Sequence, residues 1–349
     1  MLIAALRDLQ WRRRRFLIAV VGTSFVFAMT LVLTGLANGF RVEASSTVNS
    51  LGIDYFMIQN GAAGPFLGSS PFAQTEVERA QRLPGVQAAA AVVYAGTTAL
   101  DNGTPRTMNL FGAPTGGPGM PAMSQGRPPA TPDEIAVSST LGRKIGDQMH
   151  IASHNLQVVG IVNNSTVLAQ QPNLFLTTVG AQRLVYGGQP VIASVGIRGN
   201  PAKALDGYRL VDRRGAIDDM MRPLKVAVDA ISIMAVLLWV VAATIIGMFI
   251  YMSAMERTRD FAVFKAVGVK TKSMMAGLAM QAVFIAVCSA AIGVLLAMVL
   301  GPMFPMRVDV PAGAYLLLPV VAITIGLIAS LAGMRRAVTI DPAMAFGGP

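Results

Sequence analysis

The chain has 349 residues, of which 53% are hydrophobic and only 13% are charged, and its formal net charge is +10. So apolar a composition excludes an ordinary soluble protein and indicates a membrane protein. Basic chains often bind nucleic acid, but here the positive charge lies beside apolar segments rather than on one folded face, so we expect no nucleic acid as a partner.

The chain opens with a basic N-terminus, residues 1–16, which holds five Arg against one Asp. The apolar run 17–37 follows, and it is long enough to cross a bilayer as a helix, which takes about 20 residues. This run predicts the first membrane span.

An alternative interpretation of the same region is a twin-arginine export signal, because Arg13 and Arg14 precede the apolar run and the triplet 35–37 could be a cleavage site. However, the run is longer than the roughly 7 to 15 residues of a typical signal core. Gly35 and Gly39 also have the spacing that suits close helix packing. We therefore expect a span that is not cleaved.

Residues 38–225 are predicted to form one large extracytoplasmic α+β domain. Between residues 38 and 224 the sequence holds 14 Lys or Arg and 12 acidic residues, a balance typical of a folded soluble domain. Residues 54–59 and 157–162 favour strands, and residues 74–83 favour a short helix. The turn 101–103, Asp-Asn-Gly, predicts a hairpin because Asn and Gly tolerate positive φ angles.

Two further segments of this domain stand out. The stretch 112–132 is so rich in Gly and Pro that it cannot be a helix or a central strand. We expect an exposed connecting loop there; the alternative is a mobile element that contacts a partner. The charged segment 212–225 is roughly helical and is interpreted as a stalk that continues the second span outward.

Three more spans are predicted, at 226–252, 273–300 and 312–334, which gives a one-plus-three arrangement. A cytoplasmic loop 253–272 and a short external loop 301–311 join them, and 335–349 form a tail. Apart from Asp229 at an interface, the four spans contain no Lys, Arg, Glu or Asp. Ion-coupled carriers usually need such residues, so a solute pathway through these spans is not favoured.

The distribution of positive charge predicts the orientation, because Lys and Arg near short loops are retained in the cytoplasm. Residues 1–16, the loop 253–272 and the tail 335–349 carry +4, +3 and +1, which accounts for eight of the ten net charges. We therefore expect a multi-pass protein of a bacterial cytoplasmic membrane with both termini in the cytoplasm.

The loop between the second and third spans contains the most informative segment, residues 256–268. It combines both signs of charge with apolar residues and predicts a short amphipathic helix that ends at Gly268. Such a helix could rest on lipid headgroups, but mixed charge suits a protein groove better than an anionic lipid surface. Phe261 and Phe264 are expected to be its apolar anchors.

The sequence of this segment resembles the signature E-R-x-x-E-I-A-V-L-K-A-L-G of FtsX-like and MacB-like (DevC-like) ABC transporter permeases. Asp260 replaces the usual Glu, and Phe264 replaces the usual Leu. The end of the chain is similar to that family's closing R-R-A-x-x-x-x-P-x-x-A-L, and the one-plus-three order of spans also matches. The resemblance covers nearly the whole chain.

The resemblance implies which residues contact partners. The helix that docks in a partner ATPase would use Glu256, Arg257, Arg259, Asp260, Phe261, Ala262, Val263, Phe264, Lys265 and Gly268. The C-terminal motif consists of Arg335, Arg336, Asp341, Pro342 and Ala345. The expected partners are a cytoplasmic ABC ATPase dimer, a second permease copy or a related permease chain, and an external adaptor or cell-wall hydrolase.

Catalytic and metal sites are not indicated by the sequence. No segment matches the P-loop pattern G-x-x-x-x-G-K-S/T, so we expect no enzyme activity from this chain alone, with ATP and Mg bound by the partner. His150 and His154 flank a predicted hairpin, where their spacing separates them too widely for one metal ion. Cys288 lies within a span and is interpreted as a small buried apolar residue.

Three functions remain as alternatives at this stage. The first is a permease that couples ATP hydrolysis by a separate ATPase to movement of the external domain, for export or extraction of a lipid, a peptide or another substrate. The second is an FtsX-like regulator of a cell-wall hydrolase. The third is a membrane-anchored sensor or binding protein without an ATPase.

Overall fold

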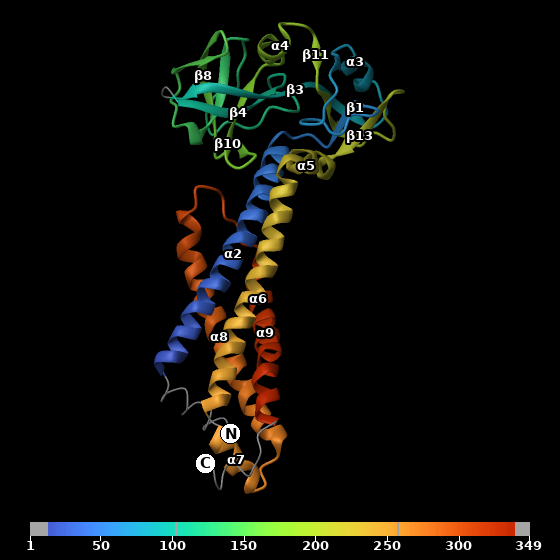
Figure 1. Cartoon of the computed structure of the whole chain (residues 1–349). Helices are drawn as coiled ribbons and strands as arrows, with labels where there is room; N and C mark the ends of the chain where they lie inside the picture. Colours follow the sequence, from blue (N-terminus) through green and yellow to red (C-terminus); the bar gives the residue numbers. More distant parts are fainter. Residues whose placement is uncertain (1–12, 102–103, 257, 339–349) are drawn as a thin grey trace. The chain divides into compact units, whose positions relative to one another are not determined.

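The computed structural model describes residues 13–101, 104–256 and 258–338 (Figure 1). The chain divides into two compact units. One combines residues 1–39 with 227–349, and the other consists of residues 40–226. The first is called the helical unit below and the second the domain.

The helical unit is built from long apolar helices. In the described part of the chain, four helices are long and apolar enough to cross a membrane. They are α2 (Arg13–Ser50, of which the first part belongs to this unit), α6 (Lys225–Glu256), α8 (Thr271–Leu300) and α9 (Ala312–Val338). The short helices are α7 (Thr258–Ala266) and the 3₁₀ turn η3 (Gly301–Met303).

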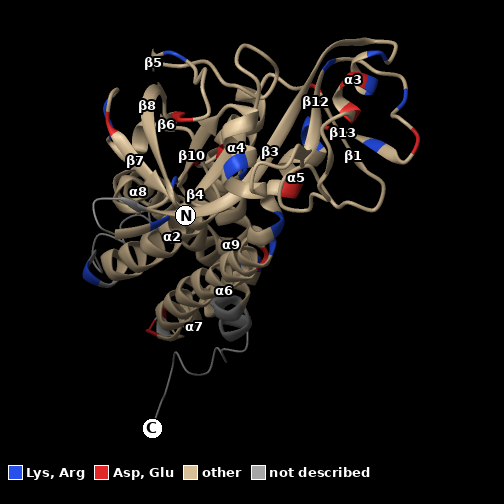
Figure 2. Cartoon of the chain, turned by 90° about the horizontal axis from the view of Figure 1, so that it is seen from above, with Lys and Arg blue, Asp and Glu red and all other residues tan. Residues whose placement is uncertain are grey.

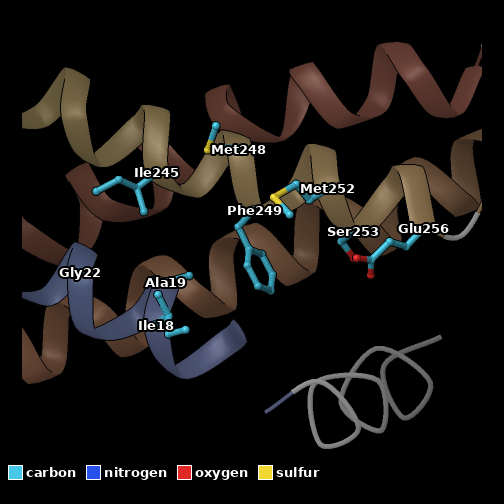
Figure 3. A pocket seen from close by; sticks show the side chains of 9 residues that line it. All are labelled: Ile18, Ala19, Gly22, Ile245, Met248, Phe249, Met252, Ser253 and Glu256. Atoms are coloured by element: carbon cyan, nitrogen blue, oxygen red, sulfur yellow. The ribbon is translucent and has the colours of Figure 1, made fainter. Parts of the chain in front are cut away.

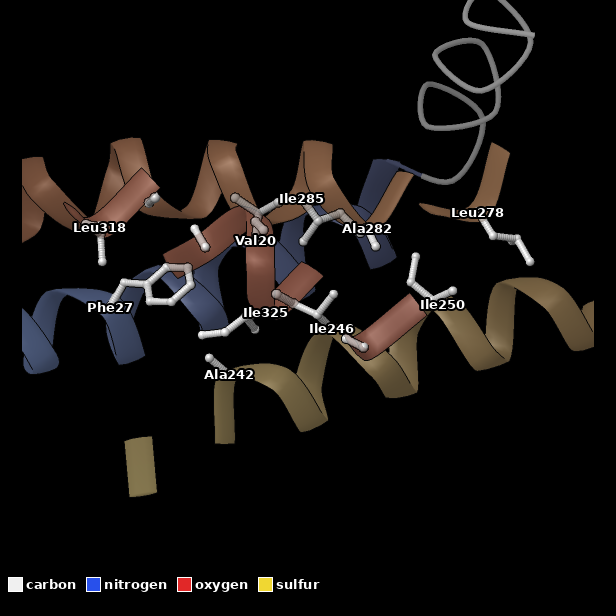
Figure 4. Close-up of a cluster of buried hydrophobic side chains, with 14 of the residues drawn as sticks. Val20, Phe27, Ala242, Ile246, Ile250, Leu278, Ala282, Ile285, Leu318 and Ile325 are labelled. Carbon is white, nitrogen blue, oxygen red and sulfur yellow. The ribbon is translucent and has the colours of Figure 1, made fainter. Parts of the chain in front are cut away.

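Small residues let these helices approach one another closely. A Cβ atom added to Gly293 of α8 would lie 3.0 Å from Cβ of Phe27 on α2. One added to Gly326 of α9 would lie 3.1 Å from the carbonyl oxygen of Ala282 on α8. Ala322 and Ser330 of α9 are fully buried, so they lie on the packing face of this helix. Figure 4 shows the apolar cluster that these helices enclose.

Gly35 and Gly39 form a second close approach, but their partner is not a helix. A Cβ atom at Gly39 would lie 1.9 Å from the carbonyl oxygen of Arg307, in the segment between η3 and α9. The amide of Asp309 donates to the Gly35 carbonyl at 2.9 Å, and the Asn38 side chain donates to the Asp309 carbonyl at 2.8 Å. These two glycines therefore seat an irregular loop against α2.

The domain is built on a large mixed sheet. Within the described residues its strand order is β13 (Tyr208–Asp212), β1 (Tyr55–Gln59), β12 (Ser194–Gly199), β3 (Val86–Asp101), β4 (Thr104–Gly112), β10 (Gln171–Leu176), β6 (Glu134–Ser138), β8 (His154–Val162) and β5 (Gln125–Gly126). Strand β7 (Gln148–Ile151) pairs with β8, and β9 (Thr166–Val167) pairs with β10. A separate ribbon joins β2 (Phe72–Ala73) to β11 (Val191–Ile192).

Both faces of this sheet are buried, because alternate residues of a strand point to opposite sides. In β1, Met57 belongs to one apolar cluster, while Phe56 and Ile58 belong to the other. In β10, Phe175 likewise lies in a different cluster from Leu174 on the same strand. The sheet therefore needs a covering layer on each side.

Helices supply these two layers. Helices α3 (Glu76–Gln81) and α4 (Thr178–Tyr186) contribute Ala80 and Ala181 to the first cluster. The other cluster receives Val48 from the end of α2, together with Ala216 and Met220 from α5 (Arg213–Met221). The fold class predicted from the sequence, four apolar helices with a large α+β domain between the first and the second, is confirmed.

The segment 212–225, predicted to be a stalk, contains two elements. Helix α5 is part of the core of the domain, because Ala216 and Met220 are fully buried. A 3₁₀ turn, η2 (Arg222–Leu224), with a Pro in its first turn, follows α5 and leads directly into α6. The helical run from Arg213 to Glu256 is thus continuous along the chain except for this tightened turn, and the extension of the second span outward stays a prediction.

The other elements predicted within the domain agree with the structure in most of their residues. Strand β1 covers 55–59 of the predicted segment 54–59, β8 covers 157–162, and α3 is shorter than the predicted helix 74–83. Strands β3 and β4 form a hairpin in which Asp101 pairs with Thr104, although residues 102–103 lie outside the described residues. Apart from Gly112, the last residue of β4, the segment 112–132 is a loop that contains only the two-residue strand β5. Figure 2 shows both signs of charge dispersed over the domain.

Substitution of Gly39 tests the close approach to the loop. Gly39→Ala should lower the melting temperature of the purified protein in detergent, because overpacking against a backbone carbonyl costs about 1 to 3 kcal/mol. Gly22→Ala on the same helix is the control, since a Cβ atom there meets nothing within 4 Å. Equal melting temperatures for the two variants would contradict the packing described.

Candidate functional site

Helix α7 lies between α6 and α8 in the chain and coincides with the predicted amphipathic segment. Its C-terminal end is well defined. Gly268 has a φ of 88°, and the amide of Val269 donates to the carbonyl of Phe264 at 2.9 Å. This six-residue hydrogen-bonded closure with a left-handed glycine is a Schellman motif, as expected from Gly268 at this position.

The side chains of α7 divide into a buried and an exposed set. Phe261 and Ala262 are 5% and 0% exposed and belong to the apolar cluster of the helical unit. Val263, Phe264 and Val267 are 45%, 49% and 78% exposed. Asp260 is also exposed. Helix α7 therefore presents an apolar surface consisting of Val263, Phe264 and Val267, which we call the α7 surface.

The expectation that Phe261 and Phe264 act together as exposed anchors is wrong for Phe261. Residues three apart on a helix differ in direction by about 60°, which is enough for one to face a core and the other to face outward. Phe261 is used inside the chain, so Phe264 is the aromatic residue of α7 that is available to a partner.

The remaining predicted contact residues are placed only in part. Glu256 is the last residue of α6, and Arg259 and Lys265 lie within α7. Arg335 and Arg336 lie in the last turns of α9. Outside the described residues are Arg257, Asp341, Pro342 and Ala345. The structure thus brings the described members of the α7 segment together at the junction of α6 and α8.

A second notable feature lies in the domain and consists of two buried carboxylates. Among the described residues, Glu43 and Asp219 are the charged residues that are buried, at 2% and 1% exposure. Glu43 lies on α2 and Asp219 on α5, the two helices that connect the domain to the rest of the chain. Burying a charge is costly unless it is hydrogen-bonded, and each of these carboxylates accepts hydrogen bonds from backbone amides.

Asp219 binds the backbone of a loop that is about 150 residues away in the sequence. Its carboxylate accepts hydrogen bonds from the amides of Phe66 at 2.8 Å, Leu67 at 3.1 Å and Gly68 at 3.1 Å. The guanidinium of Arg222 lies 3.1 Å from the same carboxylate and also donates to the carbonyl of Ala63 at 3.0 Å. We call this arrangement the Asp219 anchor.

The loop fits the carboxylate so tightly that it needs glycine. A Cβ atom at Gly64 would lie 2.0 Å from the carboxyl carbon of Asp219, and one at Gly68 would lie 2.5 Å from the Arg222 guanidinium. The ring of Phe66 packs edge-on against Phe56 and Tyr94 in the core. The same short loop therefore contributes a buried aromatic ring to the core and three amide donors to the Asp219 carboxylate.

Asp219 also influences its surroundings electrostatically. The pKa of Tyr94 is raised above its ordinary value, mainly because the hydroxyl is buried and in addition because Asp219 is negatively charged. The Tyr94 hydroxyl donates to Oδ1 of Asn109 at 2.9 Å, so it is satisfied as a neutral group. Tyr94 therefore remains protonated at physiological pH.

The other carboxylate holds a strained turn. Leu168, Ala169 and Gln170 have φ angles of 54°, 64° and 64°, a left-handed conformation that costs roughly 1 to 2 kcal/mol per residue for L-amino acids. The carboxylate of Glu43 accepts a hydrogen bond from the Gln170 amide at 3.1 Å. Thr47, one helical turn later on α2, donates to the carbonyl of Thr166 at 2.9 Å. We call this the Glu43 anchor.

Sequence reasoning missed both anchors. Glu43 and Asp219 lie in segments that contain other charged residues, and their partners are more than 100 residues away in the chain. The spacing of Gly64 and Gly68 was the available signal, because two glycines around a short apolar segment indicate a close backbone approach.

No candidate metal centre is found in the part of the chain that the structure describes. His150 and His154 lie on opposite strands of the β7–β8 hairpin, where Ile151 pairs with His154. His150 Nδ1 is 2.7 Å from Oδ1 of Asn155. The candidate functional features of the described residues are the α7 surface and the two anchors.

Comparison with known families covers both units. Residues 16–206 match the family described as MacB-like periplasmic core domain, and residues 232–342 match the one described as FtsX-like permease C-terminal. The chain belongs to the FtsX-like and MacB-like family of ABC transporter permeases. The resemblance predicted from the α7 segment and the tail is thereby confirmed. Segment 207–231, which contains α5, lies between the two matched ranges.

Relatives of this permease match along its whole length. Two from Mycobacterium tuberculosis strain H37Rv, the uncharacterized ABC transporter permeases Rv2563 and Rv0072, are 59% and 58% identical over 349 residues, with 100% of each chain covered. A putative hemin transport system permease protein HrtB from Staphylococcus haemolyticus is 22% identical, with 99% of both chains covered.

Solved structures resemble the domain of the permease at low identity. The extracellular domain of the ABC-type transporter YknZ from Gram-positive bacteria has a TM-score of 0.34 at 13% identity and covers 46% of this chain and 99% of its own. The periplasmic region of MacB from Actinobacillus actinomycetemcomitans has a TM-score of 0.35 at 12% identity and covers 47% of this chain and 91% of its own.

Family membership, together with the four apolar helices, makes the permease a multi-pass membrane protein and implies a partner ATPase.

Replacement of Asp219 tests its anchor. Asp219→Ala should destabilise the permease by about 3 to 5 kcal/mol, because it leaves the amides of the 64–68 loop and the Arg222 charge without their partner. Hydrogen exchange measured by mass spectrometry should show faster exchange in that loop. Asp218→Ala is the matched control: this neighbouring acid is exposed, so its loss should change stability by no more than about 0.5 kcal/mol. Similar exchange in the two variants would contradict the anchor.

Proposed function

We propose that this permease couples ATP hydrolysis by a separate cytoplasmic ATPase to movement of its external domain, and that this movement exports or extracts a substrate. The observation that carries the proposal is the position of α2 and α5 in the domain. The last turns of α2 and the buried face of α5 form the layer that covers one face of the sheet. The elements that lead to the membrane spans are thus part of the core of the domain.

This construction suits the transmission of force. Helix α2 is one uninterrupted helix of 38 residues from Arg13 to Ser50. Helix α5 is joined to α6 by only the 3₁₀ turn η2. The Glu43 and Asp219 anchors tie both helices to loops of the domain, so displacement of either helix would carry the attached loops and the sheet with it.

The buried side chains of the helical unit favour a mechanical role for its membrane spans over the conduction of a solute. Among its described residues the buried polar side chains are hydroxyls and one amide, with no buried ionisable group. Proton relays and ion-coupled carriers place carboxylates, histidines or basic residues at such positions. Ser289 of α8 donates to the carbonyl of Val20 on α2 at 3.2 Å, as expected of a polar residue that holds helices together. Ser24 donates to the same carbonyl within α2.

The α7 surface is the proposed docking site for the ATPase, which would bind ATP and Mg. An apolar anchor surrounded by polar residues is the usual form of an energetically important contact. Phe264 supplies the anchor, and Asp260 is exposed nearby on the same helix. This mixed surface supports a protein partner in preference to lipid alone.

A second permease copy completes the proposed assembly. The first half of α6, residues 225–241, has no buried side chain, and its exposed residues include Ile233, Leu237 and Val240. These residues are available to contact a second copy.

The proposed substrate is amphiphilic. The staphylococcal relatives are named putative hemin transport permeases, and this name supports an amphiphilic substrate for the present permease over a simple ion.

The proposed orientation places both termini and α7 in the cytoplasm, in line with the positive charge of those segments. In a Cys288→Ala background, Ser153→Cys in the domain should react with a membrane-impermeant maleimide in intact cells. Ala266→Cys in α7 should react only after permeabilisation. The reverse pattern would overturn the orientation.

The docking proposal is tested by placing a charge on the α7 surface. Phe264→Asp should abolish co-purification of the ATPase, because loss of a central aromatic anchor costs about 2 kcal/mol or more and a buried unpaired charge adds to this cost. The variant should still insert in the membrane, since the four spans are unchanged. Val179→Asp in α4 is the matched control, because Val179 is a similarly exposed apolar residue in the domain. Normal ATPase recovery with Phe264→Asp would rule out this docking site.

A further inference from the structure

The helical unit and the domain differ in how their buried polar groups are satisfied. A cavity of about 490 Å³ between α2 and α6 in the helical unit is lined mainly by apolar side chains, with Ser253 and Glu256 at one end (Figure 3). None of its lining residues has a buried polar atom without a hydrogen-bond partner. In the domain, by contrast, two such atoms belong to neighbouring side chains.

These side chains are two asparagines in the middle of the sheet. Asn109 on β4 and Asn173 on β10 are partners in the parallel register of these strands and are 1% and 0% exposed. They point to the face that α2 and α5 cover, because Phe111 and Phe175, two residues further along each strand, belong to the apolar cluster on that face. Amides buried at such positions have to find their hydrogen-bond partners inside the domain.

Each amide uses only one of its two polar atoms within the described residues. The hydroxyl of Tyr94 donates to Oδ1 of Asn109 at 2.9 Å. Nδ2 of Asn173 donates to Oγ1 of Thr47 at 3.0 Å and to Oγ of Ser165 at 3.1 Å. Nδ2 of Asn109 and Oδ1 of Asn173 are buried and have no partner there.

The two unpaired atoms are complementary, because one is a donor and the other is an acceptor. The orientation of the Asn173 amide follows from its partner: the Thr47 hydroxyl donates to the Thr166 carbonyl at 2.9 Å, so its oxygen accepts from Nδ2 of Asn173. Adjacent strands lie about 4.8 Å apart, so register partners are close enough to share one small polar molecule. A polar contact that is too long for a direct hydrogen bond is commonly bridged by water.

We propose that Asn109 and Asn173 bind one ordered water molecule, which accepts a hydrogen bond from Nδ2 of Asn109 and donates one to Oδ1 of Asn173. Buried waters in proteins satisfy polar groups in this way and are costly to remove. The backbone leaves space beside the pair, because Gly96 of β3, the register partner of Asn109, has no side chain. A Cβ atom added to Gly96 would meet nothing within 4 Å.

The water completes a chain of hydrogen bonds from α2 to the centre of the sheet. The chain begins at Thr47 on α2, which accepts from Asn173. It passes through the water to Asn109 and ends at the hydroxyl of Tyr94 on β3. The ring of Tyr94 packs edge-on against Phe66, which lies in the loop held by the Asp219 anchor. Contacts of α2 and of α5 thus meet at Tyr94.

This inference needs only the fold of the domain and does not rest on the proposed ATPase coupling. The deciding experiment is a structure of the full-length wild-type permease by electron cryomicroscopy, at a resolution that shows ordered water. One water should lie within about 2.7 to 3.2 Å of both Nδ2 of Asn109 and Oδ1 of Asn173. A structure without water between these atoms, or with the two amides in direct contact, would overturn the proposal.

A variant tests the chain in solution. Asn109→Leu removes the donor to the water, so Asn173 loses its bridged partner. Hydrogen exchange measured by mass spectrometry should become at least about fivefold faster in segment 165–173, because an unsatisfied buried polar group shifts local opening by that factor or more. Exchange in strand β1 should change by less than about twofold, since the opening is local.

Ser194→Ala is the matched control. Ser194 on β12 is also fully buried, and its hydroxyl has no partner among the described residues, but it lies outside the chain of hydrogen bonds. Its replacement should leave exchange in segment 165–173 as in the wild type. Equal exchange of this segment in Asn109→Leu and Ser194→Ala would contradict the chain, and the wild-type structure decides the water site even if Asn109→Leu does not fold.

Discussion

The packing of α2 and α5 against the sheet is the interaction on which the rest of the domain depends. Consecutive apolar residues in strands such as β1 and β10 point alternately to the two sides, so both faces of the sheet are hydrophobic. Helices α3 and α4 cover one face, but the other would be left to water without Val48, Ala216 and Met220. A soluble domain would solve this problem with helices of its own. Here the covering helices are the connections to the membrane spans, so the fold of the domain and its attachment have the same physical cause.

The membrane part shows how much a sequence can specify when one constraint dominates. A backbone in lipid must satisfy its own hydrogen bonds, so long apolar runs have to be helices, and this is why the four spans could be predicted from composition alone. Gly268 likewise predicts the end of α7, because a left-handed residue is needed there. The direction of Phe261 could not be predicted. It depends on how α7 lies against the neighbouring helices, and no local pattern in the sequence distinguishes Phe261 from Phe264.

The domain was less predictable because its decisive contacts are distant in the sequence. Asp219 follows another acid, Asp218, in a charged segment, and nothing nearby indicates that one is exposed and the other buried. Its partners are amides of a loop that is formed about 150 residues earlier. The segment 212–225 therefore resembles a solvated stalk when considered alone. Its two buried apolar residues, Ala216 and Met220, are four apart, and so short a pattern does not stand out among the charged residues around them.

The left-handed turn at Leu168, Ala169 and Gln170 has a consequence for the order in which the chain can fold. Three successive residues with side chains do not adopt positive φ unless other contacts impose it, and here those contacts come from Glu43 and Thr47. Both residues precede the turn by more than 100 positions, so they leave the ribosome first. Helix α2 thus serves as a template that already exists when the turn is synthesised. Asp219 is translated later still, after all the strands of the sheet and the loop that it binds, so the Asp219 anchor can form only once these have been synthesised.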